Sequence, residues 1–457
     1  MSADPHAARA PKRDPYAAFR SPDYRCYVVG NLISSFGRQV LGIAIGYEIF
    51  QRTHSATALG LVGLMGALPI VFLSIPAGLA ADRWNRKTII LATQLVTMLA
   101  SIGLTVLALQ HLAVPAVAPL AGAVRALYAI AAWCGEKSGV VFEPALPLMY
   151  ALLFVNGVTR AFGWAARGAL FPNLVPRAAL SNAVMWNSGN FEFTCIVGPA
   201  LGGLLIARFG VPCAYAIDAA CALACLAFVL PISAPQEISP HRAHPLQDLF
   251  SGLHFVRESK VILATITLDL FAVLLGGATA LMPIFADQIL HVGAVGLGWL
   301  RAAPSVGAVL MALALAHRPP LRRAGVAMCC AVAGFGLATI VFGLSKNFWL
   351  SLAALVATGA ADNISVVVRH TLVQLLTPDP MRGRVSAVNN IFIGSSNELG
   401  ALESGVTAAF FGPVLSVIGG GIGTVLVVLG VAWKWPEIRR IGPLQPAETV
   451  GERETTD

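Results

Sequence analysis

The chain has 457 residues, of which 56% are hydrophobic and only 12% are charged, and its mean hydropathy is +0.73. Because a soluble protein averages about 25% charged residues, this composition excludes a soluble globular protein and indicates a membrane protein with many spans. The formal net charge of +8 does not indicate a nucleic-acid partner, since the cytoplasmic loops of membrane proteins are enriched in Lys and Arg.

Residues 1–22 are polar and contain Pro and Arg, which is typical of a disordered cytoplasmic tail and not of a cleavable signal peptide. Apolar segments long enough to cross about 30 Å of hydrocarbon follow, and at roughly 35 residues for a helix and its loop the chain has room for about twelve. The predicted spans are residues 26–50, 57–80, 88–110, 144–165, 183–207, 211–231, 261–287, 294–316, 325–344, 348–368, 385–411 and 413–433.

The sequence therefore predicts an all-α integral membrane protein with twelve transmembrane helices in two pseudo-symmetric six-helix bundles. The basic residues Arg318, Arg322 and Arg323 occupy the position in the second half that matches a basic turn in the first, and this weak repeat fits two bundles around a site at the bilayer midplane. The predicted divisions are a tail at 1–22, an N-terminal bundle at 23–232, a cytoplasmic linker at 233–260 with an amphipathic helix around 246–256, a C-terminal bundle at 261–433 and a cytoplasmic tail at 434–457.

The stretch 111–143 is apolar enough between 112 and 133 to be a span by hydropathy alone. The basic loops around 83–87 and 167–177 should both be cytoplasmic, however, and this requires an even number of spans between them. We therefore predict an enlarged periplasmic loop, with a helix that lies on or dips into the membrane.

The distribution of the 31 Lys and Arg residues supports this topology, with both termini in the cytoplasm, because most of them fall on the cytoplasmic side. The basic residues that it assigns to the outside are Arg52, Arg125, Lys137, Arg208, Arg301 and Lys346.

The turn between 57–80 and 88–110 carries a dense motif. Its predicted functional residues are Gly78, Asp82, Arg83, Arg86 and Lys87. Asp82 lies beside three cations and is expected to be ionised and paired, and Gly78 is expected to let backbones approach closely. The order G-x-x-x-D-R-x-x-R-K resembles the signature loop of the major facilitator superfamily (MFS), although Asn85 stands where that family usually has Gly. The resemblance implies a conformational latch that joins the two halves in the outward-open state; the alternative is an ordinary cytoplasmic turn.

A second motif lies within 183–207 and consists of Gly198, Pro199, Gly202 and Gly203. Small residues at i and i+4 allow tight helix contact, and proline bends a helix. The pattern G-P-x-x-G-G resembles the antiporter motif of drug:proton antiporters, which implies export; the alternative is a generic packing kink. Arg160 stands where such antiporters carry a buried Arg linked to proton transfer, but here Gly163 follows three residues later instead of four.

Ionisable side chains inside a bilayer cost about 2.5–3.5 kcal/mol each and persist where they face a cavity or a partner. Asp269 has no opposite charge nearby in the sequence, and desolvation disfavours its charged form, so it could carry a proton; the alternative is a structural acid hydrogen-bonded between helices. The predicted proton-coupling residues are Asp269, Glu398 and Arg160.

Other polar residues in the predicted spans are candidates for a substrate cavity. They are Asn31, Arg38, Glu48, Asn390, Asn397 and Glu403. Glu398 and Glu403 are five residues apart, so on a helix they point about 140° from each other and cannot both face one substrate. Arg38 could bind an anionic substrate or pair with one of these acids. Asp362 and Arg369 are seven residues apart on one helix face and form a predicted inner gate; substrate contact is the alternative.

Catalytic chemistry finds no support in the sequence. The nine His residues are scattered without metal-type spacing, and no Walker-type phosphate loop is present, so ATP is not the expected energy source. Most of the eight Cys lie within apolar runs and do not form a disulfide framework. We therefore expect no enzyme activity, no metal and no cofactor, with a proton gradient as the energy source.

The stretches P-D-P-M-R-G-R-V at 378–385 and P-N-L-V-P at 172–176 resemble the enterobactin-exporter branch of MFS, over about residues 20–440. The insertion at 111–143 departs from that pattern. The resemblance implies a monomeric, proton-coupled exporter of a small amphipathic solute, siderophore-like or drug-like, that works by alternating access in a bacterial inner membrane. The alternatives are an MFS importer or facilitator, or a membrane scaffold that transports nothing.

Overall fold

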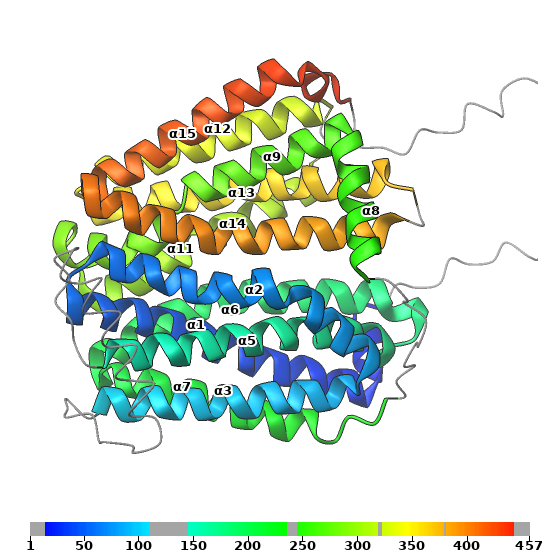
Figure 1. The fold of residues 1–457 in the computed structure, drawn as a ribbon, viewed down its shortest axis with the longest axis vertical. Coiled ribbons are helices and arrows are strands. Elements are labelled where there is room, and N and C mark those ends of the chain that lie inside the picture. The colour runs from blue at the N-terminus through cyan, green and yellow to red at the C-terminus, as the bar shows by residue number, and fades with distance from the viewer. Residues whose placement is uncertain (1–13, 110–144, 235–244, 319–321, 379–380, 443–457) are drawn as a thin grey trace, which may run out of the picture.

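The computed structural model describes residues 14–109, 145–234, 245–318, 322–378 and 381–442 (Figure 1). The predicted insertion at 111–143 lies outside these ranges. All regular elements in the described ranges are helices. The main helices are α1 Pro22–Thr53, α2 Ala56–Arg83, α3 Arg86–Leu109, α5 Leu146–Leu170, α6 Leu180–Phe209, α7 Val211–Val229, α8 Pro245–Glu258, α9 Lys260–Leu275, α10 Met282–Ile284, α11 Gly293–Ala316, α12 Ala324–Leu344, α13 Phe348–Leu376, α14 Arg382–Phe411 and α15 Pro413–Lys434.

Eleven helical segments of the described chain are long and apolar enough to cross a bilayer. One of them, Lys260–Ile289, is not a continuous α-helix: α9 ends at Leu275 and the chain continues through η4 (Ala278–Leu281), α10 and η5 (Phe285–Ile289). The twelfth long helix is α14, whose acidic and amide side chains make it less apolar than the others. The predicted all-α fold of twelve spans is therefore confirmed.

The helices form two halves, with α1 to α7 in one and α9 to α15 in the other (Figure 1). The most extensive contacts between the halves are those of α2 with α14 and of α6 with α11. Glycines allow both contacts: a Cβ atom on Gly405 would lie 2.5 Å from the Cα of Gly60, and one on Gly298 would lie 2.6 Å from the carbonyl oxygen of Pro199. Small residues let helix backbones approach this closely, so these contacts depend on glycine.

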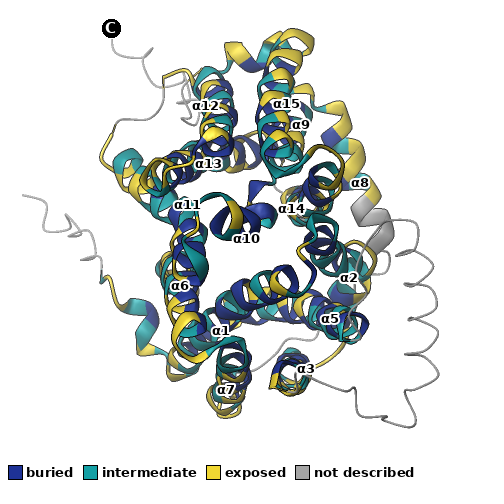
Figure 2. Ribbon diagram, turned by 90° about the vertical axis from the view of Figure 1, so that its left-hand side faces the viewer, coloured by how far each residue is buried: buried dark blue, intermediate teal, exposed yellow. Residues whose placement is uncertain are grey.

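The contacts between the halves lie toward one end of the bundle. We call the end that carries Arg83, Lys87, Arg318 and Arg322 the basic end, and the other the opposite end. A hydrophobic core that draws on both halves fills the opposite end, and α10 lies in the middle of the ring of helices there (Figure 2). At the basic end each half has its own core, one around Tyr24 and the other around Met328.

Turn geometry repeats between the halves. Gly210 between α6 and α7 has φ +80°, and Gly412 between α14 and α15 has φ +84°. The two described non-glycine residues with positive φ also occupy matching turns: His54 follows α1 and has φ 47°, and His291 follows η5 and has φ 52°. This correspondence is the backbone counterpart of the weak internal repeat in the sequence.

The predicted disordered tail at 1–22 needs a correction for its described part. Residues 17–20 form a 3-10 turn, and Tyr16 stacks on Trp186 of α6 at a ring distance of 5.9 Å. Asn182 fixes the same segment, because its side chain accepts from the Ala18 amide (3.1 Å) and donates to the Pro15 carbonyl (2.7 Å). The tail docks because its aromatic rings have apolar partners on α6. After α15, residues 436–440 likewise form a 3-10 turn with Ile438 buried.

The linker between the halves contains α8, where the amphipathic pattern at 246–256 predicts a helix. This helix crosses the basic end at a steep angle to the spans and lies outside their ring (Figures 1 and 2). It is fixed to the C-terminal half: a Cβ atom on Gly252 would lie 2.8 Å from the carbonyl oxygen of Arg384, and Arg384 donates to Ser251 Oγ (3.3 Å).

Candidate functional site

An ion pair between Arg160 of α5 and Glu398 of α14 crosses from one half to the other. The Arg160 Nη1 atom lies 2.7 Å from Glu398 Oε1, and the two side chains are 54% and 17% exposed. The carboxylate reaches Arg160 past α2 because Gly66 has no side chain: a Cβ atom there would lie 2.9 Å from Glu398 Oε2. The structure thus brings together two of the three predicted proton-coupling residues, which lie 238 positions apart in the sequence.

A third charged residue near this pair is Arg301, which the predicted topology assigns to the outside. It lies within α11. Its Nη1 atom donates to the carbonyl oxygen of Thr279 (3.1 Å), and its guanidinium lies close enough to Glu398 to interact electrostatically. The signal was available, because Arg301 falls inside the predicted span 294–316 and a charge there needs a polar partner.

One prediction pairs Arg38 of α1 with an acid of α14, but in the described structure Arg38 does not form this pair. Its Nη1 and Nη2 atoms donate to Ser34 Oγ (2.7 Å) and Ser35 Oγ (2.6 Å) of its own helix. The acid that interacts with it electrostatically is Asp218 of α7, which accepts from Ser101 Oγ (2.6 Å). Sequence reasoning missed Asp218, although it lies within the predicted span 211–231.

The cavity candidate Glu48 lies in a buried hydrogen-bonded cluster of the N-terminal half. It is buried and accepts from Arg52 Nη2 (2.6 Å) and from the hydroxyl of Tyr215 (2.5 Å). Arg52 is one helical turn away on α1, and Tyr215 is a fully buried residue of α7. Glu48 therefore joins α1 to α7 within the N-terminal half.

Asp269 has a cationic partner that its sequence neighbourhood does not show. Arg369 Nη1 of α13 lies 2.6 Å from Asp269 Oδ2, and the side chains are only 3% and 5% exposed. Arg369 also faces Asn389 Oδ1 of α14 at 3.5 Å. Asp269 is thus a neutralised acid within the C-terminal half, and its partner lies 100 positions away in the sequence.

The predicted gate pair Asp362 and Arg369 does not form in the described structure. Arg369 is turned toward Asp269 of α9, whereas Asp362 lines a small void with Asp269 and Ser365. Two acids thus compete for one guanidinium, and the one on the neighbouring helix holds it. Ser365 Oγ, which belongs to the lining of this void, is buried without a hydrogen-bond partner in the described structure, and so is Arg369 Nε.

The remaining cavity candidates do not converge on one point. Asn31 donates to Asn187 Oδ1 of α6 at 3.4 Å, and Asn397 donates to the Ile393 carbonyl of its own helix at 2.8 Å. Glu403 accepts from the adjacent Ser404 at 3.4 Å and is separate from Glu398, as its helical spacing predicts. Asn390 lies in α14, but its side chain is outside the described part of the structure.

The glycines of the G-P-x-x-G-G motif make the tight contacts that their small size predicts. A Cβ atom on Gly198 would lie 2.5 Å from Gln39 Cβ of α1. One on Gly203 would lie 2.4 Å from the Ala294 carbonyl oxygen of α11. The motif therefore packs on α1 within its own half and on α11 of the other half.

Gly298→Ala is expected to weaken the closed contact at the opposite end, because the new methyl group would meet the Pro199 carbonyl at 2.6 Å. The distance between spin labels placed on the two halves at that end should increase, and pulsed electron–electron double resonance measures this distance. The matched control is Gly189→Ala on α6, where a Cβ atom meets nothing within 4 Å. Unchanged distances in Gly298→Ala would contradict this role for the glycine contact.

The latch residues of the 83–87 turn make their hydrogen bonds within the N-terminal half. Arg86 Nη1 donates to the Ala169 carbonyl of α5 (3.0 Å), and Lys87 Nζ donates to the Ile232 carbonyl after α7 (2.8 Å). Cations near helix C-termini satisfy the free carbonyl groups there. In the described part of the chain, the turn therefore ties together helices of one half.

Two expectations for this turn are corrected by the structure. Among the described residues Asp82 forms no ion pair, because Arg86 and Lys87 are directed at carbonyl groups and Arg83 is exposed. A Cβ atom on Gly78 would meet nothing within 4 Å, so Gly78 permits no close backbone approach here. Both residues lie at the basic end, where the two halves have separate cores.

Comparisons with known proteins agree with this architecture. The sequence profile of the Major Facilitator Superfamily matches residues 27–401. The enterobactin exporters EntS of Shigella boydii serotype 18 and of Escherichia fergusonii are each 27% identical over 432 residues, covering 94% of this chain and 96% of the relative.

Solved structures share the fold at low sequence identity. A bacterial homolog of the human lysosomal transporter Spinster has a TM-score of 0.64 and 14% identity, over 94% of this chain and 97% of that one. A D-xylose-proton symporter has a TM-score of 0.65 and 15% identity, over 92% of this chain and 99% of that one. The family profile covers well over half of the sequence, and the helices cross in two bundles as in these transporters. The chain therefore belongs to the Major Facilitator Superfamily and is an integral membrane transporter, not an enzyme.

Proposed function

We propose that this transporter exports a small amphipathic solute, siderophore-like or drug-like, in exchange for protons that move inward. The direction and the solute class are supported by the similarity to enterobactin exporters along nearly the whole chain. The basic end is assigned to the cytoplasm, because cytoplasmic loops carry the excess of Lys and Arg. The conformation described here then has its halves in contact on the outer side and separate cores on the cytoplasmic side.

The observation that carries the proposal is the Arg160–Glu398 ion pair. This ion pair links α5 of one half to α14 of the other. A conformation that opens outward must separate the halves at the opposite end, and this separation would strain or break a bond across the interface. A solute that displaces Arg160 from Glu398 in the conformation described here would weaken this link and so favour separation.

The proposed transport cycle depends on the competition for the Glu398 carboxylate. With the outer side open and the solute gone, Glu398 takes a proton from outside. When the halves have closed again on the outer side, Arg160 competes for the carboxylate, and Glu398 releases its proton toward the cytoplasm. Asp269 is a weaker candidate for this role, because Arg369 already neutralises it in a buried pair. We assign a role for Asp82 and Gly78 of the 78–87 motif to the outward-open state, in which the basic ends of the halves would meet.

Inverted membrane vesicles that contain the chain test this function. We expect them to accumulate enterobactin or a cationic dye such as ethidium when their interior is acidified, and to lose it when a protonophore collapses the gradient. Accumulation that ignores the gradient would refute proton coupling. Movement only in the opposite direction would favour an importer, and the absence of movement of either probe would favour a scaffold.

A further inference from the structure

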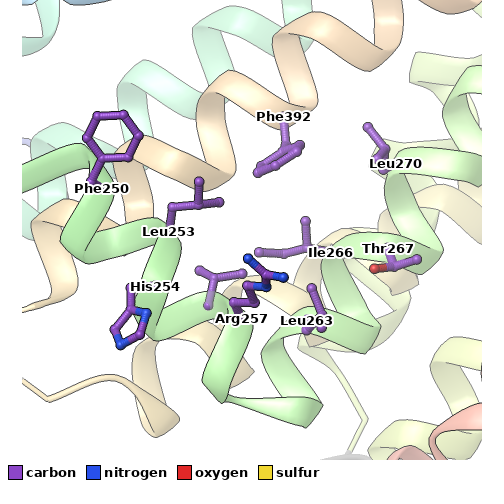
Figure 3. A pocket seen from close by; sticks show the side chains of 10 residues that line it. Phe250, Leu253, His254, Arg257, Leu263, Ile266, Thr267, Leu270 and Phe392 are labelled. Carbon is purple, nitrogen blue, oxygen red and sulfur yellow. The ribbon is translucent and has the colours of Figure 1, made fainter. Parts of the chain in front are cut away.

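A separate apolar groove lies at the basic end, away from the ion pair between the halves. It has a volume of about 520 Å³, within the range of about 300–1,000 Å³ that is usual for small-molecule sites. It runs between α8 and the first turns of α9, and Phe392 of α14 closes one side (Figure 3). Its apolar wall includes Leu253 and Val256 of α8 and Leu263, Ile266 and Leu270 of α9.

One cation enters this groove without a counter-charge. Arg257 is exposed, and its side chain extends toward Ile266 across the groove (Figure 3). No described residue forms an ion pair or a hydrogen bond with it, whereas His254, one turn earlier, faces Glu258 at 3.1 Å. An apolar groove with a free guanidinium inside it matches a ligand that has a hydrocarbon chain and an anionic head.

The position of the groove indicates that such a ligand would come from the membrane. α8 is an amphipathic helix that crosses the basic end outside the ring of spans (Figure 2), which is the place of a helix at the membrane–water interface. Leu263, Ile266 and Leu270 recur at helical spacing and form one stripe along α9. At 1.5 Å per residue this stripe extends about 10 Å from the interface toward the hydrocarbon.

We propose that this groove binds an anionic phospholipid, with its phosphate at Arg257 and one acyl chain along the stripe of α9. Juxtamembrane Lys and Arg residues attract anionic lipids in this way. Because Gly252 and Ser251 already fix α8 to α14, the lipid would fill the remaining space between the linker helix and the C-terminal half. The site does not depend on which solute is exported or on proton coupling.

Native mass spectrometry of the full chain purified in detergent tests the site, with phosphatidylglycerol and phosphatidylcholine of identical acyl chains as probes. We expect the first retained lipid to favour phosphatidylglycerol. Arg257→Gln should weaken phosphatidylglycerol binding about fivefold and leave phosphatidylcholine unchanged. Leu270→Trp, which fills the groove, should weaken both. Arg322→Gln is the matched control, because Arg322 is also exposed at the basic end but is not part of the groove.

Three results would overturn the proposal, provided that the variants melt like the wild type. Equal losses in Arg257→Gln and Arg322→Gln would mean that only overall charge matters. Undiminished binding in Leu270→Trp would mean that the groove is empty. Displacement of phosphatidylglycerol from the wild type by enterobactin would make the groove a solute site. Failure of pH-driven transport in vesicles would affect none of these measurements, so the two proposals are tested separately.

Discussion

Glu398→Gln is expected to abolish most pH-driven transport while the protein still folds. Glutamine keeps the size of the side chain but cannot exchange a proton, so the link across the halves no longer responds to pH. We therefore expect a reduction of about tenfold in the rate of gradient-driven accumulation.

Two controls separate this effect from general damage. Solute exchange at equal pH on both sides requires no titration, so Glu398→Gln vesicles should retain it. Glu403→Gln on the same helix should transport like the wild type, because the carboxylate of Glu403 forms its one described hydrogen bond with the neighbouring Ser404, at 3.4 Å. The double exchange Arg160→Glu with Glu398→Arg should recover part of the activity. Full gradient-driven transport by Glu398→Gln would remove this acid from the mechanism.

Asp269→Asn and Arg369→Gln are each expected to destabilise the protein severely. Breaking a buried ion pair leaves the other charge without compensation, which costs about 3–5 kcal/mol, and both side chains are at most 5% exposed. The double variant should be much more stable than either single one, since it leaves no charge behind. Thermal unfolding of the purified protein, followed by the reactivity of the buried Cys225 and Cys329, measures this difference.

The same variants distinguish a structural acid from a coupling acid. If Asp269 mainly holds α9 to α13, the double variant should regain both stability and pH-driven transport. A stable double variant without pH-driven transport would instead return the coupling role to Asp269. If Asp269→Asn unfolded at the same temperature as the wild type, this result would contradict the ion pair itself.

The two sequence motifs show why conformation limits a prediction from sequence. The 83–87 turn predicts a latch between the halves, but Arg86 and Lys87 hold carbonyl groups of their own half. The glycines of the 198–203 motif do meet the other half, through Ala294 and Gly298 of α11. One motif thus serves the end that is closed here, and the other is assigned to a state in which the basic end is closed.

The sequence by itself determined the membrane class, the course of the spans, the helical linker and the division into two halves. These follow from local properties, namely the length of apolar runs, the position of basic loops and the turn residues between helices. Only the tertiary structure decided which charges neutralise each other, because the partners in Asp269–Arg369 and Arg160–Glu398 lie 100 and 238 residues apart. It also showed that Arg301 lies within α11 and that Glu48 is buried between α1 and α7. A span predicted from hydropathy carries no information about the neighbour that each face of the helix meets.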